Sequence, residues 1–254
     1  MARAVPAVGG GKAKASRKKG RLPRVIAIDG PSAAGKTTVG SLVARRLGYP
    51  FLDTGAMYRA ITWVALHRGV DLGDEVDLAR LAHGVRIAVG PPPPGSIEPT
   101  AIIVDGEDIT ANLRLPEVEA AVSLVSRIPD VRRALVRTQR RLADHHPVVM
   151  AGRDIGTVVL PGAGLKVFLD ASLKERARRR HCELLALGQV ISESQVSHDL
   201  RRRDAIDSQR SASPLRPAED AIIIDTDGST LEQVVEKVLV LVYGRTQAAP
   251  EATP

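Results

Sequence analysis

The sequence predicts an α/β fold of three layers, with a five-stranded and mainly parallel sheet between layers of helices. Short apolar runs alternate with longer helical stretches, which is typical of strand–helix–strand units. A glycine-rich motif that binds phosphate lies between the first run and the first helical stretch. Of the 254 residues, 44% are hydrophobic and 26% are charged, the balance of one compact domain with a sizeable core.

Five apolar runs are expected to form the strands, because strands buried on both faces of a parallel sheet read as short continuous apolar segments. They are residues 25–28, 51–52, 148–150, 166–169 and 221–224. Helical stretches are expected at 35–47, 56–67, 116–144 with a break near Pro129, 173–187 and 231–243. The order of these elements predicts parallel pairing of the strands through crossover helices.

One segment departs from this alternation. Residues 84–110 contain VRIAV, then PPPPGS, then AIIVDGEDIT, a pattern of short strands joined by a proline-stiffened loop. We expect a small antiparallel insert there. The folded body should span residues 24–243, between a basic disordered tail at 1–23 and a loose end at 244–254.

The positive charge belongs mainly to the tail. Lysine and arginine number 36 against 29 acidic residues, a net charge of +7. Residues 1–24 hold 8 of the basic groups and no acidic group, so the remainder is 28 minus 29, or −1. With only 2% aromatic residues, the body lacks material for base-stacking surfaces. The composition argues against a nucleic-acid-binding protein.

The remaining composition indicates a cytoplasmic monomer. A single cysteine, Cys182, can form neither an internal disulfide nor a multi-thiolate metal site, which favours a reducing compartment. The sequence has no apolar run near the roughly 18 residues of a membrane span. We expect a monomer because no heptad seam stands out.

The glycine-rich motif predicts a nucleoside triphosphate site. Residues 30–37 read GPSAAGKT, which fits G-x-x-x-x-G-K-[ST] between the strand VIAID and a helix. The backbone of the loop can curl around a phosphate, Lys36 can face the outer phosphates, and Thr37 can bind Mg²⁺. The predicted ATP-binding residues are Gly30, Pro31, Ser32, Ala33, Ala34, Gly35, Lys36, Thr37 and Thr38, with Thr37 as the metal ligand.

Among proteins with such a loop, the sequence favours a small-molecule kinase. A guanine-reading Asn-Lys-x-Asp is excluded, because the single asparagine, Asn112, is followed by Leu-Arg. The strand at 148–150 runs into Ala-Gly-Arg-Asp rather than the acidic pair usual in motor ATPases. Arginines recur on separate elements, as expected where two phosphates that repel each other must be brought together.

Five separated motifs resemble those of the bacterial cytidylate kinases, within the nucleoside monophosphate kinase family. In chain order they are IDGPSAAGKTT, DTGAMYRA, GRDIGT, VFLDAS with the arginine-rich helix that follows, and RRDAIDSQRSASPL. The resemblance covers about residues 24–243, and the insert at 84–110 is similar to the one that distinguishes this family from shorter relatives. It implies an acceptor-binding region at about 54–115 and a helical lid at about 172–214.

The resemblance also implies roles for individual residues. Arg59 would face the acceptor monophosphate, with Thr54 and Tyr58 beside it. Ser123, Arg132 and Asp154 would read the cytosine ring, and Asp207 with Arg203 would lie near the ribose and phosphate. Lys36, Arg153, Arg179 and Arg210 would be catalytic, Arg153 also belonging to the acceptor site, and the arginines of 176–180 would act as phosphate and lid groups.

The implied activity is Mg²⁺-assisted phosphorylation of CMP and dCMP by ATP. A buried carboxylate such as Asp154 would accept from the exocyclic amine of cytosine and repel the carbonyl of uracil. Asp154 could instead, or also, pair with an arginine. Another acceptor, such as UMP or a non-nucleotide acid, and a nucleic-acid-stimulated NTPase remain the alternatives.

The chain departs from the family pattern at one position of interest. Family members commonly carry an acidic residue directly before Gly-Arg-Asp, where this chain has Ala151. Without that side chain, we expect Asp53 or Asp154 to help orient Mg²⁺, or Thr37 and waters to suffice.

Overall fold

The computed structural model describes residues 22–92, 96, 98–144 and 146–245. Within these ranges no helix is long and apolar enough to cross a membrane. The predictions for residues 1–21 and 246–254 lie outside the described residues. At the borders of the described residues, Leu22 packs against the core and the last helix continues to Arg245.

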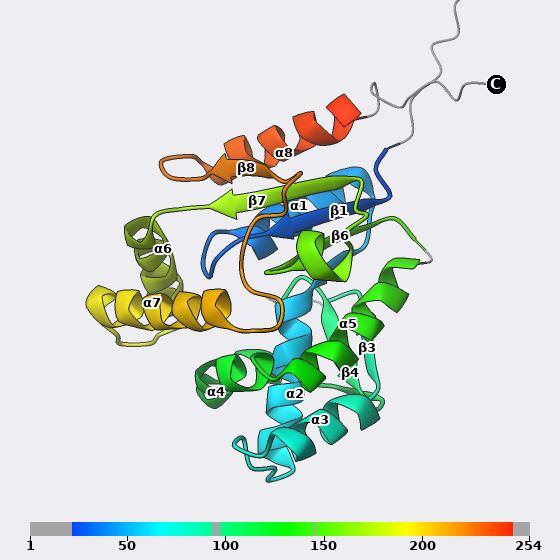
Figure 1. Ribbon diagram of the computed structural model, residues 1–254. Coiled ribbons are helices and arrows are strands. Elements are labelled where there is room, and N and C mark those ends of the chain that lie inside the picture. The colour runs from blue at the N-terminus through cyan, green and yellow to red at the C-terminus, as the bar shows by residue number, and fades with distance from the viewer. Residues whose placement is uncertain (1–21, 93–95, 97, 145, 246–254) are drawn as a thin grey trace, which may run out of the picture.

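A five-stranded parallel sheet forms the centre of the molecule, as predicted (Figure 1). The strand order is β2-β6-β1-β7-β8, so the first strand of the sequence is the middle of the sheet. The strands are β1 (Val25–Asp29), β2 (Phe51–Asp53), β6 (Val148–Gly152), β7 (Leu165–Asp170) and β8 (Ile222–Asp225).

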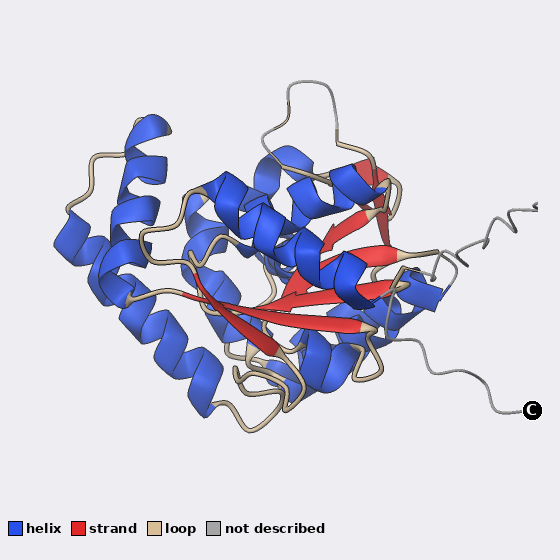
Figure 2. Cartoon of the chain, turned by 90° about the horizontal axis from the view of Figure 1, so that it is seen from above, coloured by secondary structure: helices blue, strands red, loops and turns tan. Residues whose placement is uncertain are grey.

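Helices cover both faces of this sheet (Figures 1 and 2). On one face, α1 (Lys36–Leu47) and α8 (Leu231–Arg245) pack against Ile26 and Ile28 of β1. On the other face, α2 (Thr54–His67) and α5 (Pro129–Asp144) share a core with Ala27 of the same strand. The alternation of side chains along β1 thus divides the protein into two apolar layers.

The predicted antiparallel insert is present. Strands β3 (Ile87–Gly90), β4 (Ala101–Val104) and β5 (Glu107–Asp108) form a separate sheet that packs on α2. An Asp105-Gly106 turn with positive φ at both residues joins β4 to β5, a geometry that such dipeptides adopt readily. Helix α3 (Glu75–Gly84), which precedes the insert, was not predicted.

After the insert, the chain returns to the sheet through three helical segments. The 3₁₀ helix η1 (Thr110–Arg114) leads into α4 (Pro116–Ser126). Proline is favourable at the first position of α4 because it has no N–H to leave unpaired. The predicted break near Pro129 separates α4 from α5, as expected.

The segment that the resemblance assigns to a lid consists mainly of two antiparallel helices, α6 (Leu173–Ala186) and α7 (Glu193–Gln209), which project from the sheet (Figure 1). Within this segment only residues 173–187 were expected to form a helix, so α7 was not predicted. Only two of its apolar side chains, Val196 and Leu200, pack into the small core shared with α6, so the periodic signal was weak. The Ser192 cap, which accepts from the Gln195 backbone N–H, was the available sign of a helix start.

Candidate active site

Many charged side chains surround a cavity of about 520 Å³ at the carboxyl ends of the parallel strands, between α4 and the helices α6 and α7. Ligands commonly bind at this edge in open α/β sheets. Nine basic side chains line the cavity, against five acidic ones. The basic side chains are those of Lys36, Arg59, Arg114, Arg132, Arg153, Arg179, Arg180, Arg203 and Arg210. Such an excess of cations suits anionic ligands.

The loop between β1 and α1 forms one wall of the cavity. A Cβ at Gly30 would meet the Leu169 carbonyl oxygen at 2.1 Å, so only glycine fits there. Gly35 has φ of +88° and lets the chain turn directly into α1. Six of the nine predicted loop residues line the cavity, whereas Gly30, Pro31 and Ala34 are not among its lining residues.

Lys36 lies buried in this wall. Its ammonium donates to the Pro31 carbonyl oxygen at 2.5 Å. Burial, and then the nearby charge of Arg153, hold the pKa of Lys36 well below its ordinary value. The lysine charge is therefore costly in the free protein, and an anion beside it would relieve that cost.

Thr37, the predicted metal ligand, lies beside the carboxylate of Asp53. Thr37 Oγ1 donates to Asp53 Oδ2 at 3.2 Å, and Arg59 Nη2 donates to the same oxygen at 3.0 Å. Burial raises the pKa of Asp53, but Arg59 and other cations outweigh it and hold that pKa below the ordinary range. Asp53 pairs with Ala151 across β2 and β6, so it is the carboxylate beside the position where the family commonly has an acid.

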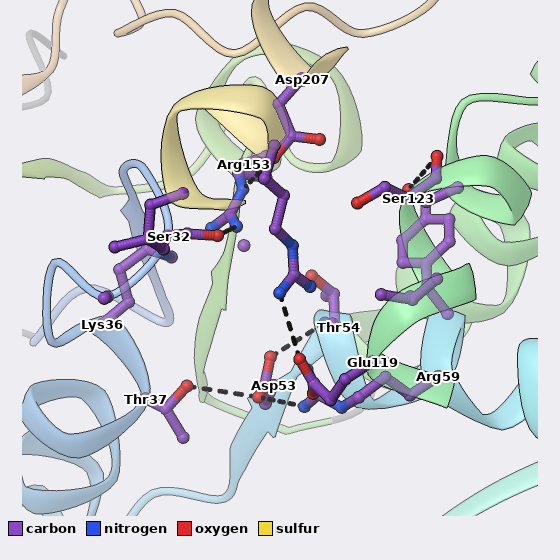
Figure 3. Close-up of a pocket in the computed structure, with 18 of the residues that line it drawn as sticks. Ser32, Lys36, Thr37, Asp53, Thr54, Arg59, Glu119, Ser123, Arg153 and Asp207 are labelled. Carbon is purple, nitrogen blue, oxygen red and sulfur yellow. Dashed lines mark hydrogen bonds and ion pairs between the residues drawn. The ribbon is translucent and has the colours of Figure 1, made fainter. Parts of the chain in front are cut away.

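Arg153 connects the loop to the lid (Figure 3). Its guanidinium donates to the Gly30 carbonyl at 3.0 Å, to Ser32 Oγ at 2.6 Å and to Asp207 Oδ2 at 2.7 Å. Burial raises the pKa of Asp207, yet Arg153 and Arg210 reverse that effect and keep it ionised. One side chain thus joins the β6 end, the phosphate loop and α7.

Asp29 fixes the turn that carries Arg153 and Asp154. Its carboxylate accepts from the backbone N–H groups of Ile155 and Gly156 at 2.8 and 2.7 Å, where the short π-helix η2 (Ile155–Val159) begins. Because the group is buried, its pKa is raised to about 6 despite these hydrogen bonds.

A second polar group lies deeper between α2, α4 and α5. Asp154 Oδ2 accepts from Arg132 Nη2 at 2.6 Å, and Asp154 Oδ1 is 3.9 Å from Arg210 Nη2. The Arg132 guanidinium lies 5.0 Å above the Tyr58 ring. Burial raises the pKa of Tyr58 to about 12. Asp154 therefore does form the ion pair considered as an alternative, while still lining the cavity beside Ser123.

Comparison with known proteins identifies the family. The model of the family described as "Cytidylate kinase" matches residues 26–243. The chain belongs to the cytidylate kinase family. It is 48% identical over 217 residues to the cytidylate kinase of Pelotomaculum thermopropionicum, covering 85% of this chain and 95% of that protein. It is 49% identical to that of Geobacillus kaustophilus, covering 87% and 96%, and 49% identical to the bifunctional pantoate ligase/cytidylate kinase of Synechococcus sp. (strain JA-3-3Ab), covering 89% and 42%.

In this family member, every residue that the resemblance assigned to the acceptor site lines the same cavity as the phosphate loop. The set comprises Thr54, Tyr58, Arg59, Ser123, Arg132, Arg153, Asp154, Arg203 and Asp207. They come from α2, α4, α5, the β6 end and α7. The structure places them together, and their individual roles stay predictions.

The arginines of α6 differ in position, because only some of them line the cavity. Arg179 and Arg180 line the cavity, although Arg179 donates to the Thr226 carbonyl at 2.7 Å and to Glu175 at 2.8 Å. Arg176 is buried beneath the loop, where it donates to the Ser32 carbonyl at 3.2 Å. Arg178 pairs with Glu175 with its side chain 59% exposed, and it is not among the lining residues.

Among the lining residues of this family member that were not predicted from the sequence are two charged ones, Arg114 and Glu119. Arg114 Nε donates to the buried Glu98 at 2.5 Å, which links the insert to the cavity. Glu119 reaches from the first turn of α4 toward the middle of the cavity (Figure 3). Neither residue stands in one of the recognised motifs, and an acidic residue near a helix start is ordinary.

Proposed function

We propose that this protein transfers the γ-phosphoryl group of ATP to the phosphate of CMP or dCMP, yielding ADP and CDP or dCDP. One observation carries the proposal: the phosphate loop with Lys36 and the buried carboxylate of Asp154 open into one cation-lined cavity. The membership of the cytidylate kinase family supports the same activity. A single exposed cysteine, Cys182, fits the cytoplasm, where pyrimidine nucleotides are interconverted.

The donor would bind at the loop between β1 and α1. Backbone N–H groups of the loop and the positive end of α1 face the phosphates, and Lys36 adds a full charge. Among the described residues, no cluster of three or more acidic, histidine or cysteine side chains could hold a metal ion by itself. This fits Mg²⁺ carried mainly by phosphates and water, with Thr37 and Asp53 as its protein contacts. Bound there, Mg²⁺ would neutralise charge on the phosphates.

The acceptor base would bind beside Asp154. Its Oδ2 is held by Arg132, whereas Oδ1 lies 3.9 Å from Arg210 and is left to accept from an exocyclic amine. Cytosine presents such an amine where uracil presents a carbonyl. A buried carboxylate that repels the carbonyl would favour CMP over UMP.

The chemistry needs alignment and charge stabilisation rather than a covalent intermediate. The acceptor phosphate is already an anionic nucleophile, so we assign no general base. Lys36, Arg153 and Arg210 would stabilise the negative charge on the transferring group, and Arg59 and Arg203 would hold the acceptor phosphate in line. Closure of α6 and α7 would exclude water and prevent idle hydrolysis of ATP.

A coupled ADP-release assay tests the proposal against its alternatives. ATP with Mg²⁺ is offered together with CMP, dCMP, UMP, AMP, GMP or shikimate, and separately with RNA or single-stranded DNA. We expect turnover with CMP and dCMP above all others and no stimulation by nucleic acid. Preference for UMP or shikimate would assign another acceptor, and stimulation by RNA or DNA would assign an NTPase.

A further inference from the structure

Glu119 lies at the centre of a cluster of arginines from four different elements. Its Oε2 accepts from Arg203 Nη1 at 3.1 Å and lies 3.8 Å from Arg180 Nη2. Its Oε1 lies 3.6 Å from Arg114 Nη1 and 3.9 Å from Arg59 Nη1. We call these four residues the Glu119 arginine cluster. Two of them belong to the acceptor side and two to the lid, so one carboxylate serves both sides of the cavity.

Glu119 makes one hydrogen bond, to Arg203, and otherwise shares its charge among three further arginines at longer range. Its side chain is only 17% exposed, yet Oε1 is buried without a hydrogen-bond partner. Burial raises the pKa of Glu119, but Arg59, Arg203, Arg114 and Arg180 outweigh it and hold that pKa at about 2. The group is therefore ionised at every pH at which the protein would work.

The cluster itself has an excess of positive charge. Burial lowers the pKa of Arg203, Glu119 raises it, and Arg153 and Arg59 lower it again, with the net result below its ordinary value. A phosphate monoester carries up to two charges and three acceptor oxygens, so it suits these guanidinium groups better than a single carboxylate does.

We propose that Glu119 is an internal competitor of the acceptor phosphate, occupying the arginines that this phosphate needs and thereby setting how tightly the site holds anions. The inference rests on the proposed function, in which Arg59 and Arg203 hold that phosphate. Glu119 acts through the arginines and is a positioning residue. In the free protein it keeps the lid and acceptor arginines gathered. When the acceptor binds, the carboxylate either withdraws or remains as a repelling charge, and both lower the affinity for the phosphate.

The test compares Glu119→Gln with Glu117→Gln, since both acids lie in the first turn of α4 but Glu117 is exposed. Inorganic phosphate is titrated calorimetrically into each protein at constant ionic strength, with Mg²⁺ and a β,γ-methylene analogue of ATP filling the donor site. We expect Glu119→Gln to bind phosphate ~10-fold more tightly than the wild type or better, because a like charge that occupies the same arginines is removed. Glu117→Gln should stay within about twofold of the wild type.

Kinetics supply a second readout that a merely structural role would not produce. In Glu119→Gln the KM for CMP should fall and inhibition by inorganic phosphate should strengthen, whereas kcat should change less than KM. Equal or weaker phosphate binding in the variant would overturn the inference. If Glu119→Gln fails to fold, Glu119→Ser is measured in its place. If both variants are unfolded, Glu119 is needed for the fold itself, and this result too would overturn the inference. Phosphate binding does not depend on CMP turnover, so a wild type inactive on CMP would count against the proposed function alone.

Discussion

Replacing Lys36 by methionine separates the contribution of this residue to catalysis from its contribution to stability. Methionine keeps most of the buried chain of Lys36 and removes only the ammonium. Because burial and Arg153 hold the pKa of Lys36 well below its ordinary value, its charge is unfavourable in the free protein. We therefore expect Lys36→Met to melt no lower than the wild type while losing phosphoryl transfer.

The size of the kinetic loss follows from the position of the ammonium. Lys36 lies in the wall of the cavity, with its ammonium on the Pro31 carbonyl oxygen at 2.5 Å, where a transferring phosphoryl group could approach to about 4 Å. At an effective dielectric constant of about 20, two unit charges at that separation attract by about 4 kcal/mol. Losing about 4 kcal/mol in the transition state lowers kcat by about 10³-fold.

Two measurements on the same preparations check this expectation. Coupled ADP release with saturating ATP and CMP gives kcat, and thermal unfolding followed by circular dichroism gives the melting temperature. Lys174→Met is the matched control, because Lys174 is an exposed lysine on α6 and its loss should leave both values near those of the wild type. Turnover of Lys36→Met within tenfold of the wild type would refute the catalytic reasoning. A melting temperature lowered by several degrees would refute the claim about its buried charge.

Three other predictions concern residues on the same edge of the sheet. Arg153→Ala should lower kcat by about 10³-fold. It should also lower the free energy of unfolding by about 3 kcal/mol, because the ion pair with Asp207 is lost. Normal kinetics of the variant would show that Arg153 has no part in catalysis. Asp154→Ala should lower the ratio of kcat/KM for CMP to kcat/KM for UMP. An unchanged ratio would show that Asp154 does not recognise the base. The pKa of Asp29 is about 6 in the folded protein and 3.8 ordinarily, so the folded state binds the Asp29 proton more tightly than the unfolded state does. The contribution of this proton to the free energy of unfolding is therefore lost as the pH rises. Between pH 4 and pH 8 the unfolding free energy of the wild type should therefore fall by about 2 kcal/mol relative to Asp29→Asn; a difference independent of pH would contradict the shift.

Local patterns predicted much of the fold. The five strands lie where short apolar runs are, because the sheet has helices on both faces, and only the edge strand β8 is largely exposed. The phosphate loop could be predicted because its function depends on neighbours in the sequence, from Gly30 to Thr37. Helix α7 could not be predicted from periodicity, since it buries only a few side chains and most of its residues are charged or polar.

The candidate site was harder to predict, because its residues meet only through tertiary structure. The spacing of Asp53, Ser123 and Asp154 in the sequence carries no information about their common cavity, and the resemblance to a family supplied most of the set. It did not supply Glu119 or Arg114, whose importance comes from the charges around them rather than from a motif. Arg178 was predicted among the phosphate and lid arginines but lies outside the cavity, because consecutive arginines on a helix point in different directions and some face solvent.

Phosphorus NMR of a single reaction tests the central claim most directly. The protein is mixed with Mg²⁺ and with equal concentrations of ATP and CMP. The signal of the γ-phosphorus of ATP is then followed with time. We expect the γ-phosphorus to reappear as the β-phosphorus of CDP, with CDP and ADP formed in equal amounts and no early inorganic phosphate. Release of inorganic phosphate while CMP stays unchanged would contradict direct transfer between two nucleotides held in one cavity.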